Sequence, residues 1–178
     1  MAKIQIGIMG PGSKATPKDL ENAYNIGKLC AQKDYLVFTG GRSSGVMEAG
    51  LKGAKEAGGL TMGILPYNKK TDASDYADIV VVTAMMSARN NINAMTCDVM
   101  VACGIESGTL SEIALAYKSN VPVIVLSDNT EGKNFLSNLE PDLTSICETP
   151  EEVMVKIEEI LEENPQAGRV SINSMVMK

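Results

Sequence analysis

Residues 35–45 read Tyr-Leu-Val-Phe-Thr-Gly-Gly-Arg-Ser-Ser-Gly, a short apolar run that ends in a glycine-rich turn. The run from Tyr35 to Thr39 is almost continuously apolar, as expected of a strand covered on both faces. After Gly45 the apolar side chains recur at helical spacing, so a helix follows the turn. The stretch therefore predicts one strand–loop–helix unit of a parallel sheet.

The same alternation extends outward from this unit to both ends of the chain. Further strands are predicted at 4–9, 60–65, 79–82, 99–103 and 121–126, with a short edge strand at 145–147. Helices are predicted from 17, from 45 and over 85–96, 110–118 and 150–163, whereas 67–76 and 127–143 carry no clear pattern. The expected fold is α/β and Rossmann-like: a doubly wound, mainly parallel sheet with helices on both faces. We expect one domain over 1–165, followed by a C-terminal tail over 166–178.

The composition argues against several classes of protein. The chain has 178 residues, no His and a formal net charge of -6. Without His there is no Ser–His or Cys–His nucleophile pair and no catalytic zinc site of the usual kind, so we expect no bound metal. An acidic surface repels nucleic acid and anionic membranes, so neither is an expected partner. No apolar stretch approaches the ~20 residues that span a bilayer.

The cysteines and the N-terminus indicate a cytoplasmic protein. Cys30, Cys97, Cys103 and Cys147 lie in apolar surroundings and form no C-x-x-C pair. They are interpreted as reduced, buried thiols and not as metal ligands or disulfides. The N-terminal run 4–9 is short and alternating, which is typical of a strand and not of a signal peptide.

Three loops that follow strands contain the residues best suited to bind an anion. In a doubly wound sheet, ligands bind outside the carboxyl ends of the strands, so we expect these loops to share one edge. Glycines let backbone N–H groups approach a phosphate, and a following helix adds positive potential at its N-terminus. The hydroxyl groups in the loops either donate to a phosphate or cap helices. The candidate residues are Gly10, Gly12, Ser13, Gly40, Gly41, Ser43, Gly45, Gly104, Ser107, Gly108 and Thr109.

Two of the three arginines fall in the same region. Arg42 lies in the loop 40–45, and Arg89 follows the strand 79–82. A guanidinium group presents a planar set of donors that matches phosphate or carboxylate. This placement favours an anion clamp over chance placement with helix capping. Lys14, in the first loop, either reaches the anion or is simply solvated.

Glu112 has two interpretations. Thr109-Leu110-Ser111-Glu112 has the T-x-x-E form of a capping box, in which the glutamate accepts a hydrogen bond at the start of its own helix. A carboxylate at that position also points toward the ligand crevice. The residues alone favour capping and leave the second interpretation open.

Three segments together resemble one protein family. They are 40–47 (Gly-Gly-Arg-Ser-Ser-Gly-Val-Met), 88–90 (Ala-Arg-Asn) and 104–114 (Gly-Ile-Glu-Ser-Gly-Thr-Leu-Ser-Glu-Ile-Ala). They resemble the molybdenum cofactor carrier protein-like family, part of a Rossmann-like superfamily that includes the Lonely Guy phosphoribohydrolases, often labelled lysine decarboxylase-like. The resemblance covers roughly 1–165.

This resemblance implies a binding protein for a phosphorylated small molecule. The ligand is a nucleotide or a pterin-type cofactor such as the molybdenum cofactor, held by the loops together with Arg42, Arg89, Asn90 and Glu112. The family also implies a homo-oligomer, either a dimer or a tetramer. Met85, Met86 and Met95 then belong either to a contact surface or to the core of an aromatic-poor protein.

Two departures from the related patterns bear on function. The third loop of the family typically reads G-G-G-x-G-T, but Ile105 and Glu106 replace two of its glycines. Their Cβ atoms limit close backbone approach, and a carboxylate repels a phosphate. The hydrolase branch carries an Arg-Lys pair where this chain has Arg89-Asn90, although its catalytic Arg and Glu map to Arg89 and Glu112.

Hydrolysis of the N-glycosidic bond of nucleoside 5′-monophosphates is therefore the alternative function. In that mechanism Glu112 assists departure of the base and Arg89 holds the phosphate, a chemistry that needs a carboxylate and not a His. A DNA-processing protein of similar fold is disfavoured by the acidic charge. A dinucleotide dehydrogenase is disfavoured because no G-x-G-x-x-G opens the first helix.

Overall fold

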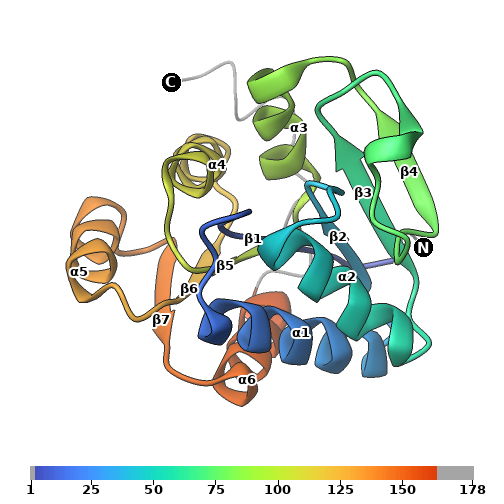
Figure 1. Ribbon diagram of the computed structural model, residues 1–178. Coiled ribbons are helices and arrows are strands. Elements are labelled where there is room, and N and C mark those ends of the chain that lie inside the picture. The colour runs from blue at the N-terminus through green and yellow to red at the C-terminus, as the bar shows by residue number, and fades with distance from the viewer. Residues whose placement is uncertain (1–2, 164–178) are drawn as a thin grey trace.

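Seven parallel strands form one sheet in the computed structural model, which describes residues 3–163 (Figure 1). The order across the sheet is β4-β3-β2-β1-β5-β6-β7. The strands are β1 (Gln5–Met9), β2 (Leu36–Thr39), β3 (Thr61–Leu65), β4 (Ile79–Val82), β5 (Val99–Cys103), β6 (Val123–Leu126) and β7 (Thr144–Cys147). The order reverses between β1 and β5, so the predicted doubly wound fold is confirmed. The predicted tail, 166–178, lies outside the described residues.

Helices cover both faces of this sheet (Figure 1). α1, α2 and α6 share one core with the sheet, and α3, α4 and α5 share the other. The helices are α1 (Pro17–Gln32), α2 (Gly45–Glu56), α3 (Arg89–Thr96), α4 (Ser107–Lys118), α5 (Thr130–Leu139) and α6 (Pro150–Glu163). Two 3-10 turns, η1 (Lys70–Asp72) and η2 (Met86–Ala88), lie in the connections on either side of β4.

The two cores follow from the period of two in the strands. In β5, Val99, Val101 and Cys103 face the first core, whereas Met100 and Ala102 face the second, and all five are fully buried. A parallel strand with helices on both sides has no solvated face, which explains its continuous apolar run.

Glycines allow α1 and α2 to pack with their backbones in close approach. A Cβ added to Gly27 in α1 would lie 2.1 Å from the Gly50 carbonyl oxygen in α2. A Cβ added to Gly53 would lie 1.9 Å from the carbonyl oxygen of Tyr24. The close contact fixes the position of α2, whose N-terminus follows the glycine-rich loop after β2.

The weak pattern over 127–143 gave no predicted element, and the structure places α5 there. The Asn129 side chain caps this helix by accepting a hydrogen bond from the Gly132 N–H at 2.9 Å. Leu136 is its one fully buried residue, and Phe135 and Leu139 remain more than half exposed. A helix with so narrow a buried face leaves little periodicity to read in the sequence.

Two predicted helix starts were also wrong. The helix expected over 85–96 begins as an α-helix only at Arg89. Ala84 and Met86 have left-handed φ angles of 54° and 49°, which a right-handed helix cannot include. The helix expected from Leu110 begins three residues earlier, at Ser107.

The four cysteine thiols are buried, whereas the three methionines considered for a contact surface are exposed. All four cysteines are buried and unpaired, as predicted, and burial raises the pKa of the Cys30 thiol to about 12. In contrast, Met85, Met86 and Met95 are exposed by 46%, 59% and 39%, so they do not fill the core.

No helix within 3–163 is both long and apolar enough to cross a bilayer.

Candidate functional site

A polar cavity of about 220 Å³ opens where β1, β2 and β5 end, beside the point at which the strand order reverses. The three glycine-rich loops meet at this edge, as the parallel topology requires. Its lining residues are Met9, Gly10, Gly12, Gly40, Arg42, Met47, Arg89, Asn90, Glu106, Ser107, Gly108, Thr109 and Glu112.

Arg42 and Arg89 converge over the ends of β1 and β2. A Cβ added to Gly12 would lie 3.1 Å from Arg42 Nη2, and one added to Gly40 would lie 2.3 Å from Arg89 Nη1. These two glycines therefore leave the space that the guanidinium groups occupy. Arg89 is the first residue of α3 and is only 7% exposed, so the helix start sets its direction.

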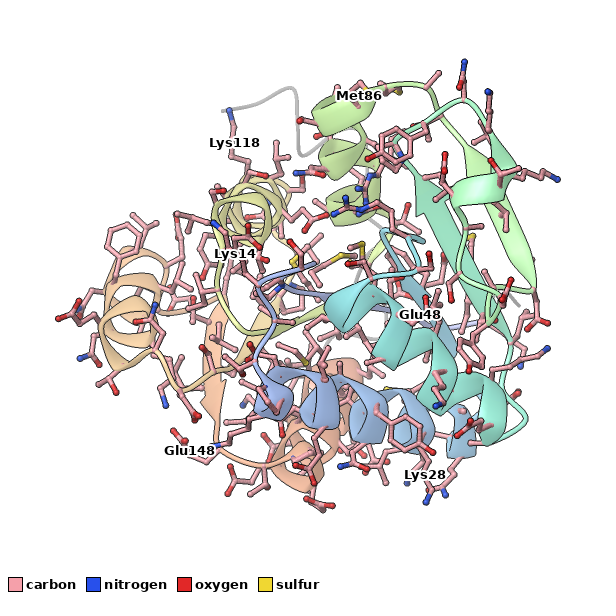
Figure 2. All side chains as sticks on the ribbon, in the orientation of Figure 1. Lys14, Lys28, Glu48, Met86, Lys118 and Glu148 are labelled. Carbon is pink, nitrogen blue, oxygen red and sulfur yellow. The ribbon has the colours of Figure 1, made fainter. Side chains whose placement is uncertain are left out.

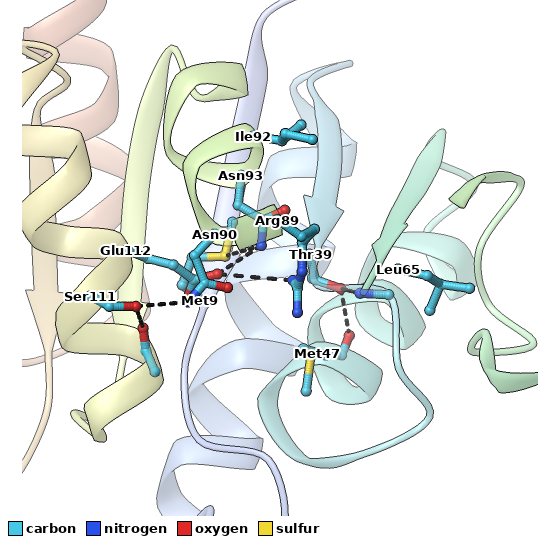
Figure 3. Close-up of polar contacts among 12 residues, drawn as sticks. Met9, Thr39, Met47, Leu65, Arg89, Asn90, Ile92, Asn93, Ser111 and Glu112 are labelled. Atoms are coloured by element: carbon cyan, nitrogen blue, oxygen red, sulfur yellow. Dashed lines mark hydrogen bonds and ion pairs between the residues drawn. The ribbon is translucent and has the colours of Figure 1, made fainter. Parts of the chain in front are cut away.

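Beneath the arginines, Glu112 and Asn93 form a buried polar pair (Figure 3). Asn93 Nδ2 donates a hydrogen bond to Glu112 Oε1 at 2.7 Å, and the same oxygen lies 4.0 Å from Arg89 Nη1. Asn93 is fully buried and Glu112 is 7% exposed. The carboxylate of α4 thus faces the guanidinium of α3 inside the cavity.

The interpretation of Glu112 as part of a capping box was wrong. α4 begins at Ser107 with Glu106 as its N-cap, so Thr109 lies inside the helix. A capping box would need Thr109 itself at the N-cap, three residues before Glu112, from whose backbone N–H its side chain would accept a hydrogen bond. Glu112 instead projects from the second turn of α4 toward α3.

A second contact joins α3 to α4 at the mouth of the cavity (Figure 3). Asn90 Nδ2 donates to Ser111 Oγ at 2.7 Å, and Ser111 Oγ donates to the Gly108 carbonyl oxygen at 2.7 Å. The chain of bonds sets the distance between Arg89 on one helix and the first turn of the other.

Burial changes the proton affinities of Glu112 and Arg89. It raises the pKa of Glu112, against the hydrogen bond from Asn93 and the positive charges of Arg89 and Arg42. Burial also lowers the pKa of Arg89, against the attraction of Glu112, and the charge of Arg42 adds to the lowering. Glu112 therefore compensates the positive charges of Arg89 and Arg42 only in part.

Several buried polar atoms around the cavity have no hydrogen-bond partner within 3–163. Three belong to lining residues: Arg42 Nε, Arg89 Nε and Thr109 Oγ1. A fourth, Asn93 Oδ1, lies on the amide that holds Glu112. Buried polar groups are nearly always hydrogen-bonded, so these atoms mark the surroundings of the cavity as incompletely satisfied.

Two predicted glycines shape the loops without lining the cavity. Gly41 has φ of 75°, and its added Cβ would lie 2.8 Å from the Gly63 Cα. Gly45 has φ of 58°, and its added Cβ would lie 2.1 Å from the Gly12 carbonyl oxygen. Both residues need a backbone conformation and a space that L side chains rarely fit. They hold the loop 40–45 against β3 and against the loop that follows β1.

Four other predicted positions also lie outside the lining. Ser13 and Ser43 are exposed. Gly104 packs against the Asp19 side chain, and together with Lys14 it lines a neighbouring cavity (Figure 2). The remaining predicted residues all contribute to the lining of the main cavity.

Met9, Met47 and Asn93 were missed by the sequence analysis. Met9 is the last residue of β1, and Met47 lies in the first turn of α2, so both belong to the edge that the motifs marked. Asn93 follows Arg89 by four residues, and in a helix that spacing places two side chains on one face. That spacing was the available signal for Asn93.

The fold and the cavity define a Rossmann-like α/β protein with a ligand site at the switch point of its sheet. Within that class, the chain belongs to the SLOG cluster4 family, whose family model matches residues 3–154.

Solved structures confirm the resemblance to molybdenum cofactor carrier proteins. A molybdenum cofactor binding protein from Rippkaea orientalis is 48% identical, with a TM-score of 0.89 over 90% of this chain and 99% of that chain. The Moco carrier protein of Chlamydomonas reinhardtii is 39% identical, with a TM-score of 0.85 over 91% of this chain and 99% of that chain. An uncharacterized protein of Archaeoglobus fulgidus is 39% identical over 158 residues, 86% of this chain and 94% of its own.

Stability should depend on pH through Glu112. Because the folded state raises its pKa above 4.5, the folded protein holds this proton more tightly than the unfolded chain. The free energy of unfolding of the wild type should therefore fall as pH rises from about 4.5 to the folded-state pKa. Glu112→Gln lacks this titration, so its stability relative to wild type should increase over that range, as measured by urea denaturation.

The matched control is Glu21→Gln, which removes an exposed carboxylate from α1. Its stability should follow that of the wild type across the same range. A Glu112→Gln curve parallel to the wild-type curve at every pH would contradict the burial cost assigned to this carboxylate.

Proposed function

We propose that the protein binds a phosphorylated pterin-type cofactor and serves as its carrier. The observation that carries the proposal is the convergence of Arg42 and Arg89 on one cavity at the switch point; the buried Nε of each has no hydrogen-bond partner within 3–163. The names of relatives at 39% and 48% identity favour the molybdenum cofactor as the particular ligand.

A phosphate monoester suits the arginine end of the cavity. Two guanidinium groups offer fork-like sets of donors, and such donors bind phosphate through charge-assisted hydrogen bonds. Their mutual repulsion, together with burial, makes the site unfavourable until an anion enters. In a chain with a net charge of -6, Arg42 and Arg89 give one end of the cavity a local positive charge.

Carriage requires reversible binding and no covalent step. The cavity is smaller than the 300–1,000 Å³ typical for drug-sized ligands. We infer that it encloses the phosphate and part of the ring system, while the rest of the ligand extends from the mouth. Such partial enclosure allows the cargo to be handed to another protein.

Arg42→Gln should weaken cofactor binding. Losing a charge-assisted hydrogen bond to phosphate costs about 1.5–3 kcal/mol, which is about 10–100-fold in affinity. The measurement is anaerobic incubation with cofactor released from a molybdoenzyme, gel filtration, and fluorescence of the oxidised pterin that elutes with the protein.

Lys14→Gln is the control, because it also removes one positive charge but lies outside the cavity lining. It should bind the cofactor like the wild type. Absence of pterin in the wild-type protein peak, or equal loss in both variants, would overturn the proposal.

The hydrolase alternative retains one supporting observation. Glu112 lies in the cavity, its pKa is raised as a general acid requires, and it is 4.0 Å from Arg89. A carrier, however, should release no adenine from AMP at high protein concentration, as followed by chromatography. Release of adenine and ribose 5-phosphate that Glu112→Gln abolishes would establish the hydrolase and contradict the carrier function.

We also propose that two copies of the chain associate through the edge strand β4. Ile79, Val81 and Val82 are 44%, 38% and 37% exposed, because the connection from β3 to β4 contains only η1 and supplies no covering helix. Met86, labelled at the top of Figure 2, is a further exposed apolar side chain in the connection that follows β4. An uncharged open edge pairs readily with an identical edge, and a two-fold dimer buries the same patch on both copies.

Light scattering should therefore report a dimer or a larger assembly for the wild type. Val81→Glu should shift the protein toward monomer by introducing a charge into the paired surface. Val155→Glu, on the exposed face of α6, should leave the assembly unchanged. A monomeric wild type at micromolar concentration would contradict this interface.

A further inference from the structure

Glu106 places a carboxylate at the end of the cavity formed by β5 and α4. It is the N-cap residue of α4 and lines the cavity beside Ser107 and Gly108. Its side chain makes no capping hydrogen bond and takes part in no hydrogen bond or ion pair with any residue of 3–163. Apart from its favourable charge at a helix N-terminus, the carboxylate has no hydrogen-bonded role within the described residues.

The neighbouring residue Thr109 points to a ligand at the same end. Its side chain is 2% exposed, its Oγ1 has no hydrogen-bond partner within the described residues, and it lines the cavity. A buried hydroxyl without a partner is rare in folded proteins. The first turn of α4 therefore offers a hydroxyl group and backbone N–H groups beside the Glu106 carboxylate.

The cavity thus has two ends that differ in charge: two arginines outweigh the single carboxylate of Glu112 at one end, and Glu106 carries a negative charge at the other. Arg42 follows β2 and Glu106 follows β5, and these two strands flank β1 in the sheet. Neighbouring strands lie about 4.8 Å apart, so the two ends are separated by on the order of 10 Å. Consistent with that separation, Glu106 forms no ion pair with Arg42 or Arg89.

The charges orient a phosphorylated ligand. A phosphate at the α4 end would lie beside the Glu106 carboxylate and be repelled, whereas the arginine end attracts it. The group that meets Glu106 must instead donate hydrogen bonds. A carboxylate presents two acceptor oxygens and is best matched by two parallel N–H donors.

We propose that Glu106 determines ligand specificity by accepting hydrogen bonds from the ring N–H and the 2-amino group of a 2-amino-4-oxopyrimidine ring, while Arg42 and Arg89 hold the phosphate of the same ligand. Pterins and guanine carry this pair of adjacent donors. Adenine presents one amino group beside a ring acceptor, which the carboxylate repels. The inference rests on the proposed binding of a phosphorylated pterin and assigns the orientation of the ligand in the site.

The test compares two ligands that differ only at the proposed contact. The probes are 6-hydroxymethylpterin phosphate and its lumazine analogue, in which a carbonyl oxygen replaces the 2-amino group. Calorimetry on the wild type should show the pterin bound at least tenfold more tightly, the ratio expected for about 1.4 kcal/mol in hydrogen bonds to a charged group. Inorganic phosphate serves as the third probe.

Two variants separate the two ends of the cavity. Glu106→Gln should reduce the preference for pterin to about threefold or less and bind inorganic phosphate at least as tightly as the wild type, since a negative charge is removed. Arg42→Gln should reduce the affinity for both ring compounds by a similar factor and leave the ratio of the two affinities unchanged. Glu106→Gly, which removes the side chain, should also lose the preference for pterin over lumazine. It serves as a control because the glutamine of Glu106→Gln could itself make a new contact with the ring.

The outcomes distinguish this inference from the carrier function. Equal affinity of the wild type for the pterin and lumazine compounds, or a preference that survives in both Glu106 variants, overturns the role of Glu106 and leaves phosphopterin binding intact. If neither ring compound nor phosphate binds the wild type, the carrier function and the role of Glu106 both fail.

Discussion

The buried guanidinium group of Arg89 constrains the rest of the site, because the neighbouring residues accommodate both its volume and its charge. Removing this charge from water costs free energy that a single acidic neighbour at 4.0 Å repays only in part. Gly40 leaves room for the group, Glu112 opposes its charge, and Asn93 holds Glu112 in place. Buried ion pairs seldom add stability, so this arrangement contributes little to folding, and the proposed function assigns it the binding of an anion.

The loops after β1 and β2 behave as one unit because their backbones touch, and side chains join α3 to α4. The left-handed turn at Gly45 places α2 directly against the carbonyl oxygens of Pro11 and Gly12. The Val46 N–H donates to the Pro11 carbonyl oxygen at 3.0 Å, which joins the loop after β2 to the loop after β1. Asn90 and Ser111 join α3 to α4 on the opposite side of the cavity. The positions of the charged groups are therefore set by backbone contacts that tolerate little change.

The strands and the edge that carries the site were predictable because a parallel sheet encodes them strongly. Strands covered on both faces appear as short apolar runs, and their carboxyl ends meet at one edge whatever the loop sequences are. α5 was not predictable, since one fully buried side chain gives no helical period. The start of α3 was not predictable either, because the left-handed residues Ala84 and Met86 are not glycines.

The sequence by itself determined the strands, the helices other than α5, the location of the glycine-rich loops and the two arginines that follow strands. Only the tertiary structure decided the role of Glu112, because moving the start of α4 to Ser107 turns that carboxylate from a cap into a neighbour of Arg89. Only the tertiary structure brought Asn93 next to Glu112 at the cavity and left Glu106 without a partner among the residues 3–163. The physical reason is that propensity and periodicity act over a few residues, whereas the environment of a charge depends on groups from several distant elements.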